Sequence, residues 1–173
     1  ALSDNSKSKQ RLAAFSPDGS KVAFVRDNNL FVKELNSGEE IRITKDGEKN
    51  KIINGATDWV YEEEFGDDHG FFWSPNSTKI AYYRFDESNV KEFQMAMYGS
   101  LYPEQYKFKY PKAGEENSTV SVHVYNLEQR RKVDCRIGEG GHYVPRVKWT
   151  NDDNVVAIWK MNRHQNKLEI ITN

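Results

Sequence analysis

The sequence predicts an all-β fold: a partial β-propeller of about three blades, with a short helical insertion and an extended arm. Three observations lead to this prediction. A turn-and-strand pattern occurs three times, short segments alternate apolar and polar residues, and no long amphipathic helix is visible. Four short strands per repeat are typical of a propeller blade.

Each repeat begins with an aromatic residue, passes through a polar turn and ends in a β-branched strand. The copies occupy 15–24, 73–82 and 149–158, and the third is degenerate. In the first copy Ser-Pro-Asp-Gly favours a turn, because Pro fixes φ, Asp bonds its own backbone and Gly accepts a positive φ. We therefore expect a β-hairpin in each copy. Further strands are expected at 29–33, 40–44, 119–125 and 167–171.

The spacing of the repeats indicates two insertions. The aromatic anchors Phe15, Trp73 and Trp149 stand 58 and 76 residues apart, whereas ordinary propeller blades repeat every ~40–45 residues. The excess falls at 54–68 and at 91–117, and insertions in repeat proteins tend to lie on a functional face. The second insertion is rich in Tyr, Phe and Pro, which favours an extended arm or a β-hairpin folded back on its own blade.

Three blades cannot close a ring, and each blade needs neighbours to bury its two faces. We therefore interpret residues 1–173 as a fragment of a larger propeller domain. The other interpretation is a complete three-repeat domain of irregular shape.

Composition excludes several classes of function. The net charge is −1 with acids and bases interspersed, which argues against a nucleic-acid partner. No run of 18 apolar residues is present, so no membrane span is expected in this chain. Cys135 is the only cysteine, which leaves no intrachain disulfide and no Cys/His zinc pattern. We expect no metal and no cofactor.

The first insertion contains a run of acids that could bind a cation. It reads Asp58-Trp59-Val60-Tyr61-Glu62-Glu63-Glu64, and Asp58 is a good helix N-cap. Adjacent side chains diverge by about 100° on a helix and by 180° on a strand, so only a helical turn lets two consecutive carboxylates converge on one ligand. A primary ammonium, with three donors and no acceptor, suits such a pair. A solvated acidic loop is the alternative, and a metal site is a weaker one.

These residues resemble the signature of the dipeptidyl peptidase IV family. Other segments that resemble family sequences follow in order and extend the match over most of the chain. They are Trp73-Ser74-Pro75-Asn76, Tyr110-Pro111-Lys112-Ala113-Gly114 and Val144-Pro145-Arg146-Val147-Lys148-Trp149. The lone cysteine suggests a bacterial member, located in the periplasm or at the cell surface, because mammalian members resemble disulfide-stapled ectodomains.

The resemblance implies a parent serine exopeptidase with an N-terminal eight-bladed propeller and an α/β-hydrolase domain. In this family the last two glutamates of the motif, here Glu63 and Glu64, bind the free amine of a peptide substrate. Asp58, Trp59, Tyr61 and Glu62 are the expected supporting residues. The parent is expected to release N-terminal dipeptides with a penultimate Pro or Ala, and to form a homodimer through the arm at 91–117.

The sequence also departs from the family pattern. The family places an arginine upstream of the first repeat, where this chain reads Asn5. The segment after Glu64 is about one residue shorter than in mammalian members. No Gly-x-Ser-x-Gly nucleophile motif occurs, and residues 66–70 have the glycine spacing with Asp68 at the centre. The catalytic domain and its Ser-Asp-His triad are therefore expected outside this chain, and the chain alone is expected to be inactive. The alternative function is a non-catalytic propeller that binds a partner, or a family member that has lost its nucleophile.

Overall fold

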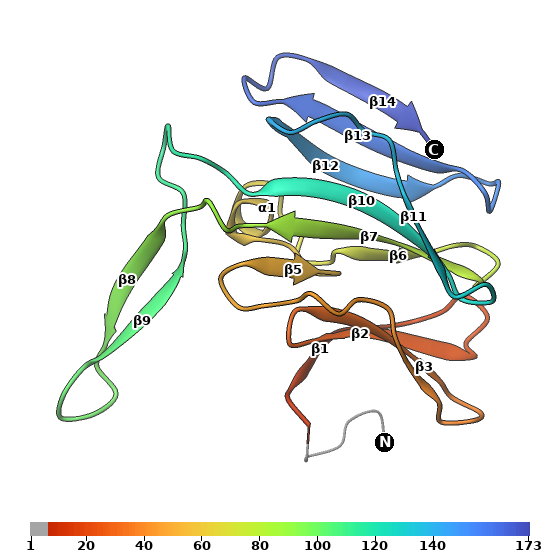
Figure 1. Ribbon diagram of the computed structural model, residues 1–173, viewed down its shortest axis with the longest axis horizontal. Helices are drawn as coiled ribbons and strands as arrows, with labels where there is room; N and C mark the ends of the chain where they lie inside the picture. The colour runs from red at the N-terminus through yellow and green to blue at the C-terminus, as the bar shows by residue number, and fades with distance from the viewer. Residues whose placement is uncertain (1–6) are drawn as a thin grey trace.

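The computed structural model describes residues 7–173 and shows three β-sheets side by side, with a separate hairpin projecting from the middle one (Figure 1). The chain runs through the sheets in order, so each sheet is built from one stretch of sequence. The first sheet has the order β1-β2-β3-β4. Its strands are β1 (Gln10–Phe15), β2 (Lys21–Arg26), β3 (Asn29–Glu34) and β4 (Glu40–Arg42).

The middle sheet is centred on β7, which pairs along its whole length with β10. β11 extends the sheet on the far side of β10, whereas β5 and β6 pair with different halves of the other edge of β7. The strands are β5 (Ile52–Asn54), β6 (Phe71–Trp73), β7 (Lys79–Asp86), β10 (Thr119–Asn126) and β11 (Arg131–Asp134). Both insertions expected from the sequence therefore belong to this blade.

The third sheet has three strands within the described residues, one fewer than the four expected per blade. They are β12 (His142–Trp149), β13 (Val156–Asn162) and β14 (Leu168–Thr172). β12 and β13 form the hairpin expected from the degenerate third repeat. The predicted all-β, partial-propeller fold is confirmed, although strand β4 ends at Arg42, two residues earlier than expected.

The aromatic anchors of the repeats join each blade to the one before it. The Trp73 indole N–H donates to the Ala14 carbonyl oxygen at 3.2 Å. The Trp149 indole N–H donates to the Phe72 carbonyl oxygen at 2.9 Å. The acceptor in each case lies one residue before the preceding anchor. Phe15, the first anchor, has 68% of its side chain exposed, so within the described residues it has no blade to join.

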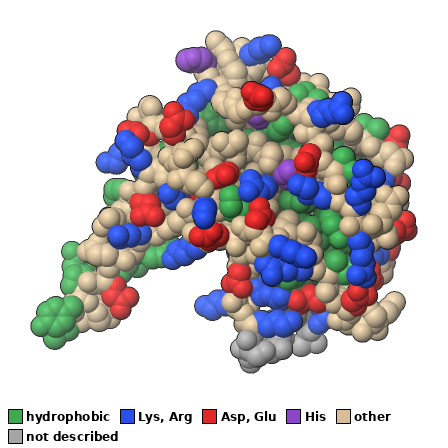
Figure 2. Space-filling model, viewed as in Figure 1, with side chains coloured by type: hydrophobic (Ala, Val, Ile, Leu, Met, Phe, Trp, Pro, Cys, Tyr) green, Lys and Arg blue, Asp and Glu red, His purple; other side chains and the backbone are tan. Residues whose placement is uncertain are grey.

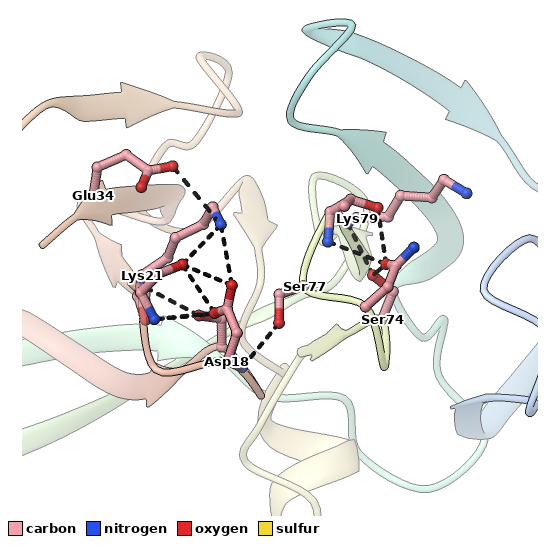
Figure 3. Close-up of polar contacts among 10 residues, drawn as sticks. Asp18, Lys21, Glu34, Ser74, Ser77 and Lys79 are labelled. Atoms are coloured by element: carbon pink, nitrogen blue, oxygen red, sulfur yellow. Dashed lines mark hydrogen bonds and ion pairs between the residues drawn. The ribbon is translucent and has the colours of Figure 1, made fainter. Parts of the chain in front are cut away.

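The repeat turns make a second contact of the same kind. The Asp18 backbone N–H donates to the Ser77 hydroxyl at 3.0 Å (Figure 3). One blade further on, the Asn76 backbone N–H donates to the Asp153 carboxylate at 2.9 Å. Ser77 has a φ of 62°, which side-chain-bearing residues seldom adopt. The hydrogen bond to Asp18 explains why a residue with a hydroxyl occupies this position instead of the glycine found at Gly19.

Between β7 and β10 the chain leaves the blade as a two-stranded hairpin, which we call the arm. Its strands, β8 (Glu92–Met97) and β9 (Glu104–Lys109), pair only with each other. The arm extends away from the sheets (Figure 1) and carries hydrophobic side chains at its outer end (Figure 2). The second insertion is therefore a β-hairpin that extends as an arm: its strands pair with no strand of the blade, although the Asn50 amide just before β5 donates to the Lys107 carbonyl at 3.4 Å.

The core is formed by the facing surfaces of the three sheets. Its largest fully buried side chains in the middle blade are Tyr82, Tyr83, Phe85, Phe71 and Ile80. No helix in the described residues is long and apolar enough to cross a membrane.

The contacts between repeats predict a measurable loss of stability when an indole N–H is removed. Trp149→Phe keeps an aromatic ring but leaves the Phe72 carbonyl without its donor, so unfolding should become easier by about 1 kcal/mol or more. Urea unfolding of the chain, followed by circular dichroism, measures the change. Phe15→Leu is the matched control and should change stability by less than about 0.5 kcal/mol, because Phe15 is exposed. Equal effects of the two substitutions would contradict a stabilising role for the hydrogen bond between Trp149 and Phe72.

Candidate functional site

The acidic motif lies on a short helix, α1 (Trp59–Glu64), held at the edge of the middle blade. β5 precedes the helix, β6 follows it, and both strands pair with β7. An isolated bridge between Ala56 and His69 closes the neck of the insertion. The insertion is therefore a loop tied at both ends to one strand, and the predicted helical turn is confirmed.

Asp58 begins the helix. One carboxylate oxygen accepts the Tyr61 backbone N–H at 3.1 Å, as an N-cap does. The other oxygen accepts the Ser118 hydroxyl at 2.7 Å, just before β10 starts. Asp58 is buried, and this burial raises the pKa of its carboxyl, while the Ser118 hydroxyl and the Tyr61 N–H act in the opposite direction.

Trp59 packs the start of the helix against the root of the arm. Its ring lies 4.3 Å from the ring of Tyr110, centroid to centroid, at an angle of 58°. Tyr110 is the first residue after β9 and its N–H donates to the Lys91 carbonyl on the other side of the root. The helix therefore contacts the arm where its two strands meet the blade.

Tyr61 ties the helix to the third blade. Its hydroxyl oxygen accepts the Val144 backbone N–H at 2.6 Å. The ring is buried, with edge contacts to the rings of Phe65, Tyr83 and Phe85. This burial raises the pKa of Tyr61 well above its usual range, so the side chain stays neutral.

A second tyrosine completes this contact. The Tyr83 hydroxyl donates to the Val144 carbonyl oxygen at 3.0 Å. Val144 lies at an irregularity of β12, where Val144 and Pro145 stand opposite the single residue Lys160. Two hydroxyls of the middle blade therefore satisfy both backbone groups of Val144. We call this arrangement the tyrosine clamp.

The three glutamates of the motif are exposed at the end of this anchored helix. Within residues 7–173, none of the three carboxylates takes part in a hydrogen bond or an ion pair. The last turn of the helix contains no basic residue, and negative charge near a helix C-terminus is unfavourable. The arrangement therefore leaves carboxylates available to a cation from outside.

Other charged groups surround the helix. The Asp67 backbone N–H donates to the Tyr61 carbonyl just past the helix end. Partial burial raises the pKa of the Asp67 carboxyl, and the field of Arg146 lowers it. Burial also raises the pKa of the Glu87 carboxyl to about 7, and the Asp58 charge adds to the effect.

The structure brings the predicted site residues together in two roles. Asp58, Trp59 and Tyr61 hold the helix, while Glu62, Glu63 and Glu64 face solvent. Asn5, where the sequence lacks the family arginine, lies outside the described residues. Sequence reasoning missed Ser118 and Tyr83, since neither belongs to a motif. It did single out the segments containing Tyr110 and Val144, but not their contacts with the helix.

A Ser-His-Asp hydrogen-bond chain also occurs in the middle blade. His123 Nε2 lies 2.9 Å from the Ser121 hydroxyl, and Nδ1 lies 2.7 Å from Asp134. Ser121 and His123 are on β10 and Asp134 is on β11, paired directly with His123. The chain satisfies both nitrogens of a buried imidazole, whose pKa is lowered chiefly by burial. These contacts give His123 a structural role within the blade.

The fold and the site together define a class of protein: part of a β-propeller in which one blade carries an acidic helix anchored to its neighbours. Residues 1–173 match the family described as the dipeptidyl peptidase IV (DPP IV) N-terminal region, and the chain belongs to this family.

Similarity to individual proteins agrees with this assignment. The chain is 34% identical to a probable dipeptidyl-aminopeptidase B of Talaromyces marneffei over 97% of its own length and 20% of the relative. It is 34% identical to human prolyl endopeptidase FAP, over 88% of this chain and 21% of the relative.

Among solved structures, the crystal structure of Porphyromonas gingivalis dipeptidyl peptidase 4 superimposes with a TM-score of 0.93. The sequence identity is 45%, and the match covers 99% of this chain and 24% of that one. The chain thus spans about a fifth to a quarter of the length of the proteins it resembles.

The tyrosine clamp predicts that a single hydroxyl stabilises the contact between blades. Tyr61→Phe leaves the buried Val144 N–H without an acceptor, so the free energy of unfolding should fall by about 1–3 kcal/mol. Tyr83→Phe should cost about the same or less, since it leaves a carbonyl unpaired. Urea unfolding of the chain gives both values, and Tyr102→Phe, on the exposed end of the arm, is the control. A Tyr61→Phe chain as stable as this control would show that the clamp contributes nothing.

Proposed function

We propose that this chain is the substrate-binding part of a dipeptidyl-peptidase-IV-like serine exopeptidase, in which Glu63 and Glu64 bind the N-terminal ammonium of a peptide. The observation that carries the proposal is the exposed pair of carboxylates on a helix anchored at Asp58, Trp59 and Tyr61. The motif resembles that of the family, and this resemblance supports Glu63 and Glu64 as the residues that bind the ammonium.

The chemistry of the pair suits a primary ammonium. An ammonium has three donors and a compact charge, and hydrogen bonds between charged groups are about twice as strong as neutral ones. Two carboxylates one residue apart on a helix can each accept one of the three donors. A peptide without a free amine lacks both the charge and these donors.

Amine binding at a fixed distance from the reacting bond would make the enzyme an exopeptidase. In this proposal the parent protein releases N-terminal dipeptides with a penultimate Pro or Ala. The nucleophile comes from an α/β-hydrolase domain outside these 173 residues. The related human protein is named an endopeptidase, so the proposal needs a test that separates the two modes of cleavage.

Substitution of the pair in the full-length protein is that test. Glu63→Ala and Glu64→Ala each remove one charge-assisted hydrogen bond, worth about 1.5–3 kcal/mol. The kcat/KM for a free-amine Gly-Pro reporter should therefore fall roughly ten- to a hundred-fold. Glu62→Ala is the matched control and should have a much smaller effect, since its side chain lies about 200° around the helix axis from Glu64 and so points to nearly the opposite side.

The same enzyme should cleave an N-acetylated reporter poorly, whatever residue occupies positions 63 and 64. If both alanine variants cleaved the free-amine reporter as fast as the natural protein, the amine assignment would be wrong. Absence of any serine-type turnover in the natural protein would instead favour a non-catalytic propeller that binds a partner.

We also propose that the arm at 91–117 joins two copies of the parent protein. Its outer end exposes large apolar side chains, including Tyr98 at 84%, Leu101 at 90% and Tyr102 at 80%. Such a patch on a projecting hairpin is typical of an interaction surface.

Charges placed at the end of the arm should separate the copies. Leu101→Glu combined with Tyr102→Glu is expected to convert the full-length dimer to monomer in sedimentation velocity, because two carboxylates would be buried at the contact. Glu128→Lys, at an exposed turn away from the arm, is the control and should leave the dimer intact. A dimer unchanged by the double substitution would place the interface elsewhere.

A further inference from the structure

The segment that returns from the arm to the blade contacts the start of the acidic helix at two points. The Tyr110 ring lies against the Trp59 ring, and the Ser118 hydroxyl donates to the Asp58 carboxylate at 2.7 Å. These residues bracket the stretch 110–118, which joins β9 to β10. We call it the return segment. It belongs to the second insertion, whereas the helix belongs to the first.

The helix needs support from outside itself. It has six residues, and helices so short are not stable alone in water. Glu62 stands in the first turn, but Glu63 and Glu64 are carboxylates at the end where the helix dipole disfavours negative charge. Mutual repulsion of adjacent acids adds to this. The direction in which Glu63 and Glu64 point is therefore set by what holds the other residues of the helix.

Two independent supports are visible. The tyrosine clamp fixes the middle of the helix through Tyr61 and the third blade. The return segment fixes the start of the helix through Asp58 and Trp59. One support fixes a point, whereas two supports on different residues also limit rotation about the helix axis. That rotation decides whether two adjacent carboxylates can reach the same ammonium.

Ser118 is the more specific of the two contacts of the return segment. The Asp58 carboxylate uses one oxygen for the Tyr61 N–H and the other for the Ser118 hydroxyl. Both contacts stabilise the ionised form of a carboxylate that is buried near a second one, Glu87. Without the Ser118 hydroxyl, one oxygen of a buried carboxylate would lose its donor, and the N-cap could shift to find another.

We propose that Ser118, supported by Tyr110, is a positioning residue for amine recognition: through Asp58 it sets the orientation at which Glu63 and Glu64 meet the substrate ammonium. This inference rests on the proposed function of the glutamate pair. It assigns a substrate-related role to a serine that carries no charge and is not part of the acidic motif.

The test compares three substitutions in the full-length protein, assayed with a Gly-Pro reporter that has a free amine. Ser118→Ala should raise KM about three- to tenfold with less than a twofold change in kcat. Ser118→Thr retains the hydroxyl and should restore most of the affinity. Ser37→Ala removes a hydroxyl that accepts the Glu39 backbone N–H in the turn between β3 and β4 of the first sheet, and should change neither constant.

A double substitution shows whether Ser118 acts through the glutamates. In a Glu63→Gln background, Ser118→Ala should add less than a twofold further increase in KM, since the oriented pair is already broken. An equal increase in both backgrounds, or failure of Ser118→Thr to restore affinity, would overturn the inference. So would a Ser118→Ala enzyme indistinguishable from Ser37→Ala while Glu63→Ala still impairs cleavage. If Glu63→Ala and Glu64→Ala have no effect, the proposed function itself fails.

Discussion

The site depends on one residue of backbone, Val144, whose N–H and carbonyl are both held by tyrosine hydroxyls of the neighbouring blade. Buried backbone groups must find partners, and the irregularity of β12 leaves these two groups without partners from β13. Pro145 beside it has no N–H to donate. The Val144 N–H and carbonyl therefore bond to the middle blade instead of to β13. The bond from the N–H to the Tyr61 hydroxyl attaches the acidic helix to β12. Without the Val144 N–H in this position, the helix would lose the hydrogen bond that attaches it to the third blade.

The middle blade connects every functional feature of the chain. The acidic helix lies between β5 and β6, which both pair with one edge of β7, and the arm follows the end of β7. The two insertions then meet again at Trp59 with Tyr110 and at Asp58 with Ser118. Because β7 pairs over eight residues with β10, both insertions are attached to one long, largely buried strand. At both Trp73 and Trp149 an indole N–H donates to a backbone carbonyl of the preceding blade. The contacts between blades are therefore repeated, whereas the two insertions occur only in the middle blade.

The sequence predicted what depends on local pattern. The hairpins at 15–24 and 73–82, the helical turn after Asp58 and the two insertions follow from turn chemistry and from the spacing of aromatic anchors. Contacts between distant residues could not be predicted in this way. Tyr61 and Val144 are 83 residues apart, and no periodicity relates a helix to a strand irregularity in another blade. Ser118 is one polar residue among many in a loop, and its partner becomes visible only in three dimensions. The direction of the arm likewise depends on packing at its root, which composition does not specify.

We propose that a helix anchored by other parts of the chain offers Glu63 and Glu64 to a peptide N-terminus. A crystal structure of the full-length protein with a slowly cleaved free-amine dipeptide bound tests it most directly. We expect the ammonium nitrogen at about 2.7–3.2 Å from a carboxylate oxygen of each glutamate, with Tyr61 and Ser118 still in their present contacts. A peptide bound with its amine elsewhere, and with both carboxylates facing only water, would contradict it.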